Sequence, residues 1–472
     1  MMSAMKKLLF LTVGVLGGAI WGAPAKVVDV SRVDPHYFET ADGRTFVPVG
    51  VNLVSGVQRG NEASLRRYEG WLEKFAANGG NWIRIWLSAG AFETMPKEAG
   101  VFDPAADEVL KRVMAKCEKL GIKVKFTLEH FRSTLADSSK ARQPWANRTL
   151  YAPYSNTMHD FFTSEQCMKI YLERVNHLKE LGFGDSPSMA CWEPWNEINA
   201  AGWVMDYAPW SDRILAELAR LFPKQMVTQN LGSYSSPAAY GHYEQMAGVN
   251  LNAYMQIHRY LDPGAQIDVC RGPMDVLAAE SIREMRELRP DRPAVLAETG
   301  AVEANHAGAS HLYKLDKQGT MMHDLLFAPF FAGGAGCGQL WHWDSYIDAN
   351  NLWYHFARFA KAIEGLDPAA EHFRPFRTET ARLRVYGLRG QKTTVIWCRD
   401  KKSTWETEVE KGVPPQTVQG ERLPFANCTF ACYLPWEDKA VSLPAPALPA
   451  FTRSIVVRFP TDPAYARIIE PH

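Results

Sequence analysis

The sequence predicts an α/β protein, a (β/α)8 TIM barrel followed by a small C-terminal antiparallel β-sandwich. From about residue 40, short β-rich runs alternate eight times with segments of helical spacing. After about residue 368 the pattern changes to alternating β-branched runs without a convincing helix. The length of 472 residues also exceeds the size at which one hydrophobic core stops growing. We therefore expect a barrel over 26–368 and a sandwich over 369–472.

The eight predicted strands are 46–54, 81–88, 123–131, 188–197, 225–231, 249–258, 293–299 and 336–344. The predicted helices are 63–78, 105–120, 164–182, 211–222, 272–289 and 312–331, and 353–366 closes the series. A doubly wound sheet is the competing fold. It usually has a glycine-rich phosphate turn after its first strand, and "GVNLVSGVQRG" is not such a turn.

The N-terminus is typical of a secretory signal peptide. A basic "MMSAMKK" precedes an apolar run of 13 residues, and "APA" follows before Lys26. We expect residues 1–25 to be cleaved and the protein to be secreted or periplasmic, with an uncleaved anchor as the alternative. The apolar run is short for a transmembrane helix. Lys and Arg balance Asp and Glu at 52 each, so no nucleic-acid or membrane partner is expected.

Cysteine and histidine spacing predicts no metal site. The eight cysteines are scattered, and we expect one or two disulfides at most. Cys191, Cys337 and Cys398 lie in strand-like apolar runs and are expected to be buried free thiols. The sequence also lacks a dense His/Asp cluster and a phosphate-binding glycine loop, so neither a metal nor a cofactor is expected.

Polar or aromatic side chains stand at the ends of the predicted strands. They are Asn52, Arg84, His130, Asn196 with Glu197, His258 with Tyr260, Glu298, and Trp341 with Trp343. Barrels place their active sites at these carboxyl ends. Glu197 on the fourth strand and Glu298 on the seventh would face each other across the mouth. Two carboxylates flanking a bond are what glycoside hydrolysis requires.

Glu193 lies near Glu197 but is expected to differ from it. Strand alternation places Glu193, Trp195 and Glu197 on one face, with tryptophans forming walls of the site. Glu193 would lie about 13 Å further down the strand, at roughly 3.3 Å per residue. We therefore expect Glu193 to be buried beside a cation, and Glu197 to be the catalytic group.

The motifs "WNE", "HRY", "AET" and "LWHW", in this order and each near a strand end, resemble clan A of the glycoside hydrolases. The resemblance is greatest to family 5, which includes cellulases and β-mannanases, and spans about residues 40–365. It implies a (β/α)8 barrel and a retaining double displacement, with Glu197 as acid/base and Glu298 as nucleophile. Two features depart from the family: Ile198 follows the Asn-Glu pair where proline is common, and the two glutamates are 101 residues apart.

The resemblance also implies roles for the other strand-end residues. Asn196 would hold the sugar 2-hydroxyl, Arg84 would keep Glu298 ionised, and Tyr260 would contact Glu298. His258 would lie at the acid/base, and His130 would line a sugar subsite. Trp341 or Trp343 would form the platform beneath the reacting sugar. Asn52 completes the expected substrate-binding set.

The expected substrate is a β-linked oligo- or polysaccharide, hydrolysed by an endo-β-mannanase or β-glucanase type of enzyme. An exo-acting β-mannosidase, β-glucosidase or β-galactosidase of the same clan is the alternative. The long connections 132–163 and 198–210 could wall off the pocket that exo action needs. A catalytically inactive carbohydrate-binding barrel is a third hypothesis, which the presence of both glutamates disfavours. The sequence names neither the sugar nor the oligomeric state.

Overall fold

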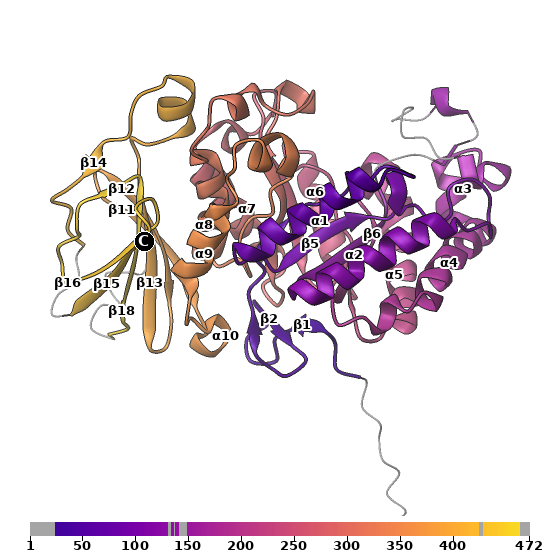
Figure 1. Cartoon of the computed structure of the whole chain (residues 1–472), viewed down its shortest axis with the longest axis horizontal. Helices are drawn as coiled ribbons and strands as arrows, with labels where there is room; N and C mark the ends of the chain where they lie inside the picture. Colours follow the sequence, from indigo (N-terminus) through magenta and orange to yellow (C-terminus); the bar gives the residue numbers. More distant parts are fainter. Residues whose placement is uncertain (1–23, 131–133, 136, 141–148, 424–427, 463–472) are drawn as a thin grey trace, which may run out of the picture.

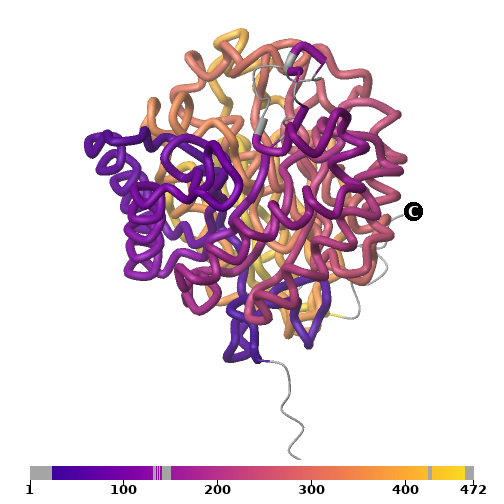
Figure 2. Tube along the Cα trace, turned by 90° about the vertical axis from the view of Figure 1, so that its right-hand side faces the viewer, coloured from indigo at the N-terminus to yellow at the C-terminus, as the bar shows by residue number. Residues whose placement is uncertain are grey.

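The computed structural model describes residues 24–130, 134–135, 137–140, 149–423 and 428–462. Its centre is a parallel β-sheet with helices packed around it (Figures 1 and 2). Five neighbouring strands of this sheet are, in order, β4 (Gly50–Val51), β5 (Trp82–Trp86), β6 (Lys123–Glu129), β7 (Met189–Trp195) and β8 (Met226–Val227). A separate parallel pair consists of β9 (Met255–Leu261) and β10 (Ala294–Ala301).

Two backbone links connect this pair to the five-stranded sheet. Leu340 forms parallel bridges with both Val51 and Thr299, and so lies between β4 and β10. On the other side, the Ala253 N–H donates to the Val227 carbonyl at 3.0 Å, between β8 and the start of β9. The parallel strands and their links thus account for each of the first seven predicted strands, although β4 and β8 are only two residues long.

The eighth predicted strand, over 336–344, is wrong as a regular strand. Within it Leu340 is the residue that forms parallel bridges, and Trp343–Asp348 forms a π-helical turn. Cys337, Gln339 and Trp341 also donate their N–H groups to the carbonyls of Pro48, Leu296 and Thr299 at 3.1, 2.9 and 3.0 Å. Glycine weakens strands, and a Cβ atom at Gly338 would collide with the Leu325 carbonyl of the helix behind it. The segment therefore passes α8 as a glycine-rich crossing that is hydrogen-bonded to both neighbouring strands without forming a regular ladder.

Ten α-helices are formed within the described residues. They are α1 (Glu62–Ala77), α2 (Pro104–Leu120), α3 (Met158–Thr163), α4 (Glu165–Glu180), α5 (Val204–Leu221), α6 (Ala239–Ala247), α7 (Met274–Leu288), α8 (Thr320–Phe331), α9 (Tyr354–Ile363) and α10 (Pro368–Glu371). The helices α1, α2, α4 and α7 match predicted ones within two residues, α5 starts seven residues earlier than predicted, and α9 ends three residues earlier. The helices α3, α6 and α10 were not predicted. Helix α8 starts eight residues late, because the Asp316 carboxylate caps it by accepting from the Thr320 and Met321 N–H groups at 2.8 and 2.9 Å.

A small antiparallel sheet covers the amino ends of the parallel strands. It consists of β1 (Val28–Val30), β2 (Phe38–Thr40) and β3 (Thr45–Phe46). Val28 and Phe38 pack in one apolar cluster with residues near the beginning of the parallel strands, such as Trp82. This packing excludes water from the end of the sheet opposite the strand-end residues that the sequence singles out.

The C-terminal part is antiparallel, as predicted (Figure 1). Its six-stranded sheet has the order β11 (Arg374–Glu379), β12 (Leu383–Arg389), β13 (Thr393–Asp400), β18 (Ser454–Pro460), β15 (Thr429–Leu434) and β16 (Lys439–Pro444). A second sheet has only two strands, β14 (Thr417–Val418) and β17 (Phe451–Thr452). The β-sandwich and the domain boundary at 368/369 therefore stay predictions.

Strand alternation gives the six-stranded sheet two apolar faces. On β13, Val395 and Trp397 belong to the large core shared with the helices, whereas Ile396 and Cys398 belong to a separate cluster. The ring of Trp397 lies 5.8 Å from that of Phe327 on α8. The sheet is thus packed onto α8 by a continuous apolar core.

Buried ion pairs accompany this apolar contact. Arg399 holds Asp324 of α8 through two hydrogen bonds of 2.6 and 3.2 Å. Arg384 holds Asp275 of α7 in the same way, at 2.5 and 2.8 Å. All four side chains are buried, so each carboxylate depends on its arginine for compensation.

All eight cysteines are free thiols, so the allowed disulfides are not formed and the buried thiols at Cys191, Cys337 and Cys398 are confirmed. None of the helices in the described part of the chain combines the length and apolarity that a membrane span needs. The predicted signal peptide lies outside the described residues except for its last two positions, and so does part of the connection 132–163.

We predict that Arg399→Ala lowers the free energy of unfolding by about 3–5 kcal/mol, because it leaves the buried Asp324 carboxylate without a counter-charge. Arg213→Ala is the matched control, since Arg213 pairs with Glu165 on the surface, where such pairs contribute about 0–1 kcal/mol. Denaturant unfolding of both variants provides the measurement. Equal losses for the two variants would contradict a charged interface between α8 and the sheet.

Candidate active site

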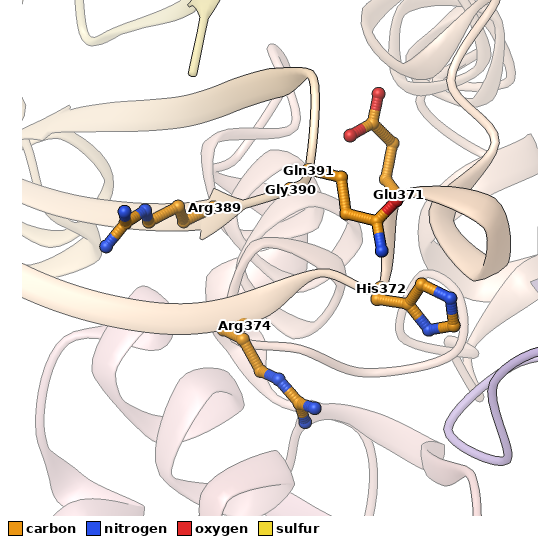
Figure 3. Close-up of a pocket in the computed structure, with 6 residues that line it drawn as sticks. All are labelled: Glu371, His372, Arg374, Arg389, Gly390 and Gln391. Carbon is orange, nitrogen blue, oxygen red and sulfur yellow. The ribbon is translucent and has the colours of Figure 1, made fainter. Parts of the chain in front are cut away.

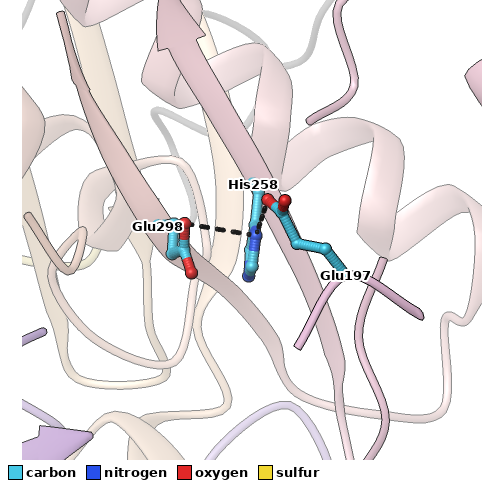
Figure 4. Close-up of side chains that lie close together, drawn as sticks. All are labelled: Glu197, His258 and Glu298. Carbon is cyan, nitrogen blue, oxygen red and sulfur yellow. Dashed lines mark hydrogen bonds and ion pairs between the residues drawn. The ribbon is translucent and has the colours of Figure 1, made fainter. Parts of the chain in front are cut away.

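Two glutamates and a histidine meet at the carboxyl ends of the parallel strands (Figure 4). Glu197 lies two residues after the end of β7, and Glu298 lies on β10 in register with His258 of β9. His258 Nδ1 lies 2.8 Å from Glu197 Oε1 and 3.4 Å from Glu298 Oε2. A carboxylate oxygen of Glu197 and one of Glu298 are within 4.8 Å of each other. The two carboxylates predicted to face each other are thus brought together.

Glu298 is held by donors on both oxygens. Arg84 of β5 donates from Nη1 to Oε1 at 2.5 Å, and the Tyr260 hydroxyl donates to Oε2 at 2.8 Å. Arg84 has no exposed surface, so its charge acts in a medium of low polarity. Burial raises the pKa of Tyr260 well above its usual value, which keeps the hydroxyl a donor. Both contacts favour a negative charge on Glu298.

Glu193 is fully buried below the pair and is ionised. Burial acts against its charge, but the charges of Arg84 and Lys125 lower its pKa to about 2. Arg84 Nε donates to Glu193 Oε1 at 2.8 Å, and Lys125 Nζ donates to Oε2 at 3.1 Å. The prediction that Glu193 pairs with a cation is confirmed. Because its oxygens are occupied by protein donors, Glu193 supports Arg84 and has no free oxygen to offer a substrate.

Glu197 has the opposite electrostatic environment. Burial raises its pKa, although His306 and Arg84 partly oppose this, and 19% of the side chain is still exposed. Burial also lowers the pKa of His258 to about 4, so the imidazole is neutral near neutral pH. A neutral His258 does not force Glu197 to ionise. Glu197 is therefore the group suited to carry a proton, and Glu298 the group suited to carry charge.

Asn230 is a site residue that the sequence analysis missed. The backbone of Glu197 has φ 52° and ψ 52°, in the left-handed region that residues other than glycine rarely adopt. Its N–H donates to Asn230 Oδ1 at 2.6 Å, and Asn230 Nδ2 donates to Glu193 Oε2 at 2.7 Å. Asn230 thereby couples the backbone of Glu197 to Glu193. The available signal was its position near the end of the predicted strand 225–231.

Asn196 lies beside the pair, as predicted. Its Oδ1 accepts from Arg84 Nη2 at 2.5 Å. Its Nδ2 is buried and, within the described part of the chain, has no hydrogen-bond partner. A buried amide donor left unpaired costs free energy, so it is a candidate to donate to a ligand hydroxyl. Its role toward the sugar stays a prediction.

Asn52 is occupied by the protein itself. It has no exposed surface, and its Nδ2 donates to the carbonyls of Ala297 and Gln339 at 2.9 Å each. These bonds tie the end of β4 to β10 and to the irregular crossing. Its surroundings favour a structural role over the predicted sugar contact.

His130 is fixed against an aromatic side chain at the mouth. Its ring stacks on Trp86 with centroids 5.0 Å apart and an interplanar angle of 2°, and its Nδ1 lies 2.7 Å from Ser88 Oγ. Trp341 also contacts Trp86, with ring centroids 5.0 Å apart and an interplanar angle of 48°. Trp86, at the end of β5, was not singled out from the sequence. The three rings form one aromatic cluster, in which Trp86 and His130 are buried and Trp341 is partly exposed, so Trp341 is the ring that can meet the apolar face of a sugar.

The two strand-eight tryptophans differ in exposure. Trp343 is only 6% exposed and packs edge-on against Trp71 at 6.1 Å, inside the core. Trp341 is only partly buried and contacts Trp86. Of the two tryptophans, Trp341 is therefore the candidate for the platform beneath the reacting sugar.

Trp195 does not form a wall of the site. It is fully buried and packs against Phe161 of α3 and Trp210 of α5, with ring centroids 5.5 and 5.9 Å apart. Glu193 instead lies among Arg84 and Lys125. The expectation that Trp195 shares the face of Glu193 and Glu197 is therefore wrong.

The carboxylates and His258 also have the spacing of metal ligands. Among the described residues, Glu197, His258 and Glu298 are the one group of three that could hold an ion. However, Arg84 and Tyr260 already occupy both oxygens of Glu298, and a cation would lie close to the Arg84 guanidinium. The donor set fits a metal poorly, and the expected absence of one stays a prediction.

A separate hollow of about 550 Å³ lies where α10 meets the β11–β12 hairpin (Figure 3). Its lining includes Glu371, which accepts from the Lys392 and Thr393 N–H groups at 2.8 and 3.1 Å. Arg374 and Arg389 point in different directions and do not converge on one point (Figure 3). The hollow brings together no acid–base pair of the kind found at Glu197 and Glu298.

No protein-family model matches the sequence, and no curated protein sequence does. Solved structures do match. A protein described as a glycoside hydrolase aligns over 93% of this chain and 97% of its own, with 12% identity and a TM-score of 0.59. A glycoside hydrolase family 5 protein from Bacteroides vulgatus ATCC 8482 aligns over 92% and 93%, with 12% identity and a TM-score of 0.57. This chain resembles family 5 glycoside hydrolases in fold. The similarity includes the C-terminal sheet as well as the parallel sheet, since the alignments span nearly the whole chain.

We predict that Glu197→Gly is more stable than Glu197→Ala by about 1 kcal/mol, because only glycine adopts the left-handed backbone without strain. Both variants lose the same side-chain contacts, so the comparison isolates the backbone. The order should reverse at Asp212, an exposed position within α5, where alanine is favoured over glycine by about 1 kcal/mol. Thermal unfolding of the four variants measures both differences. A Glu197→Ala variant as stable as Glu197→Gly would contradict the observed φ.

Proposed function

We propose that this protein is a retaining glycoside hydrolase acting on β-linked glycans, with Glu197 as acid/base and Glu298 as nucleophile. The observation that carries the proposal is the short distance between two carboxylates in unlike surroundings. Oxygens of Glu197 and Glu298 lie within 4.8 Å, whereas retaining enzymes separate their carboxyl groups by roughly 5–5.5 Å and inverting ones by roughly 6.5–9.5 Å. This spacing favours direct attack by Glu298 over the activation of a water molecule that an inverting reaction needs.

The first step needs a proton on Glu197 and a charge on Glu298. Glu298 attacks the anomeric carbon while Glu197 protonates the departing oxygen, so the glycosidic bond breaks as the Glu298–sugar bond forms. The charge on Glu298 disappears in this ester. In the second step Glu197, now ionised, takes a proton from water, and the hydroxide displaces Glu298 with restored configuration.

The scaffold of this proposal is a closed (β/α)8 barrel. The bridges through Leu340 and the bond between Ala253 and Val227 support closure, and so does the fold shared with family 5 structures. The signal-like N-terminus supports export, since extracellular polysaccharides are substrates for secreted enzymes. An endo-β-mannanase or β-glucanase is the main proposal and an exo-β-glycosidase the alternative. The partly exposed Trp341, backed by the buried rings of Trp86 and His130, fits a stacked sugar in either case.

We predict that Glu298→Ala abolishes turnover and that Glu197→Ala lowers kcat/KM by about 10²–10⁴ for substrates with poor leaving groups. Azide should rescue Glu197→Ala and yield a β-glycosyl azide, because the small anion replaces water on the covalent intermediate. With Glu298→Ala it should yield the α-azide by direct attack. Product analysis by NMR distinguishes these outcomes. Near-normal turnover by either variant would refute the assignment.

We also predict that kcat/KM falls as pH rises through the pKa of Glu197, which burial raises. Below that pKa Glu197 is protonated and can act as acid, and above it the acid is lost. The dinitrophenolate group of a dinitrophenyl glycoside departs without protonation by an acid. With this substrate, Glu197→Gln should show no alkaline decrease in pH profiles of kcat/KM. A decrease that persists in the variant would assign the acid to another group.

Removal of metal ions by a chelator distinguishes hydrolysis by the two glutamates from metal-dependent hydrolysis at the same residues. Extended dialysis against EDTA should leave activity unchanged, because both oxygens of Glu298 are bound by protein donors. A loss of activity that is restored by a divalent cation would favour the metal site. No hydrolysis of mannan, glucomannan, cellulose, xylan or aryl β-glycosides would favour the carbohydrate-binding barrel.

A further inference from the structure

A chain of hydrogen bonds behind the catalytic pair ends on His342, a residue to which the proposed mechanism gives no role. The Tyr313 hydroxyl accepts from the Ala301 N–H at 2.5 Å and lies 3.0 Å from His342 Nδ1. Ala301 is the last residue of β10, the strand that carries Glu298. Within the described residues the hydroxyl forms no other hydrogen bond, so its own proton points to His342 Nδ1. Tyr313 therefore donates, and Nδ1 accepts.

Gly300 makes this arrangement possible. Its φ is 155°, and a Cβ atom there would lie 2.5 Å from the Tyr313 hydroxyl and 3.2 Å from His342 Nδ1. Any side chain at this position would push the hydroxyl away from the imidazole. The close approach of backbone, phenol and imidazole thus depends on a glycine two residues after the proposed nucleophile.

The tautomer of His342 follows from these contacts. Burial lowers the pKa of His342 to about 4, so the ring is neutral near neutral pH and carries one proton. Because Nδ1 accepts from Tyr313, that proton is on Nε2. His342 is only partly buried. Its Nε2 is not an enclosed polar atom that has been left without a hydrogen-bond partner. The Nε2–H group is therefore a donor that reaches the solvent.

The position of this donor is beside the reacting groups. The His342 ring lies 6.4 Å from the ring of Tyr260, at an interplanar angle of 73°. Tyr260 in turn donates to Glu298. His342 also directly follows Trp341, the candidate sugar platform, in the sequence. A sugar stacked on Trp341 and attacked by Glu298 would thus present its hydroxyls to the neighbourhood of His342.

We propose that His342 Nε2–H is a preset donor to a hydroxyl group of the pyranose that becomes bonded to Glu298. The inference rests on the proposed function and adds a specificity-determining residue to it. A donor whose tautomer is fixed before binding loses no free energy in reorganising, and it selects for an acceptor oxygen at one place on the sugar. Tyr313 is a positioning residue, since it acts only through His342.

The kinetic test compares His342→Ala, His342→Gln and Tyr313→Phe on the hydrolysed substrate. His342→Ala should lower kcat/KM about 10-fold, the usual worth of one hydrogen bond to a neutral group. His342→Gln should recover part of this loss, because the Gln amide can reach the place of Nε2. Tyr313→Phe should lower kcat/KM in the wild type but have no further effect in His342→Ala. His311→Ala is the control, since the exposed His311 bonds to Glu303 in the same connection.

A structural readout keeps this test independent of the proposed function. Ring ¹⁵N NMR of His342 should show protonated Nε2 and unprotonated Nδ1, and Tyr313→Phe should change that pattern. If the wild type hydrolyses no β-glycoside, the proposed function is refuted. The spectrum would still test the hydrogen bond from Tyr313 to His342. A proton on Nδ1, or a His342→Ala variant within about twofold of the active wild type, overturns the proposal.

Discussion

The site depends on one buried cation, the guanidinium of Arg84. It has no exposed surface and lies between two carboxylates, Glu193 below it and Glu298 above it. A buried charge without compensation costs several kcal/mol, so this cation and its two anions stabilise one another in a fixed geometry. Glu193 holds Arg84 from one side, and Arg84 in turn holds Glu298. Through Asn230, Glu193 also sets the backbone of Glu197. One ionised network thereby positions both glutamates of the proposed catalytic pair.

The same network explains why the two glutamates can behave differently. Glu298 receives Arg84 and Tyr260, which stabilise its charge. Glu197 is bound by a neutral His258 and by the backbone contact of Asn230, and burial outweighs the opposing charges of His306 and Arg84, so its pKa is raised. His258 contacts both carboxylates without adding a charge.

Most of the fold and the identity of the pair could be predicted from the sequence. Hydrophobic runs of the right length alternate with helical spacing, and Glu197 and Glu298 each end or nearly end such a run. Periodicity reports which face is buried, but not when a backbone leaves the strand. It therefore missed the turn at Glu197, the packing of Trp195 against the helices, and the glycine-rich crossing around Leu340. Asn230, Trp86 and Tyr313 were missed because their roles come from contacts between distant segments.

Covalent trapping tests the central claim most directly. Incubation with 2-deoxy-2-fluoro β-mannosyl and β-glucosyl fluorides slows hydrolysis of the glycosyl-enzyme, so the intermediate accumulates and its mass can be read. The account predicts that one fluorosugar is added per chain and that peptide mapping places it on Glu298. A label on Glu197, or a product released with inverted anomeric configuration, would contradict it.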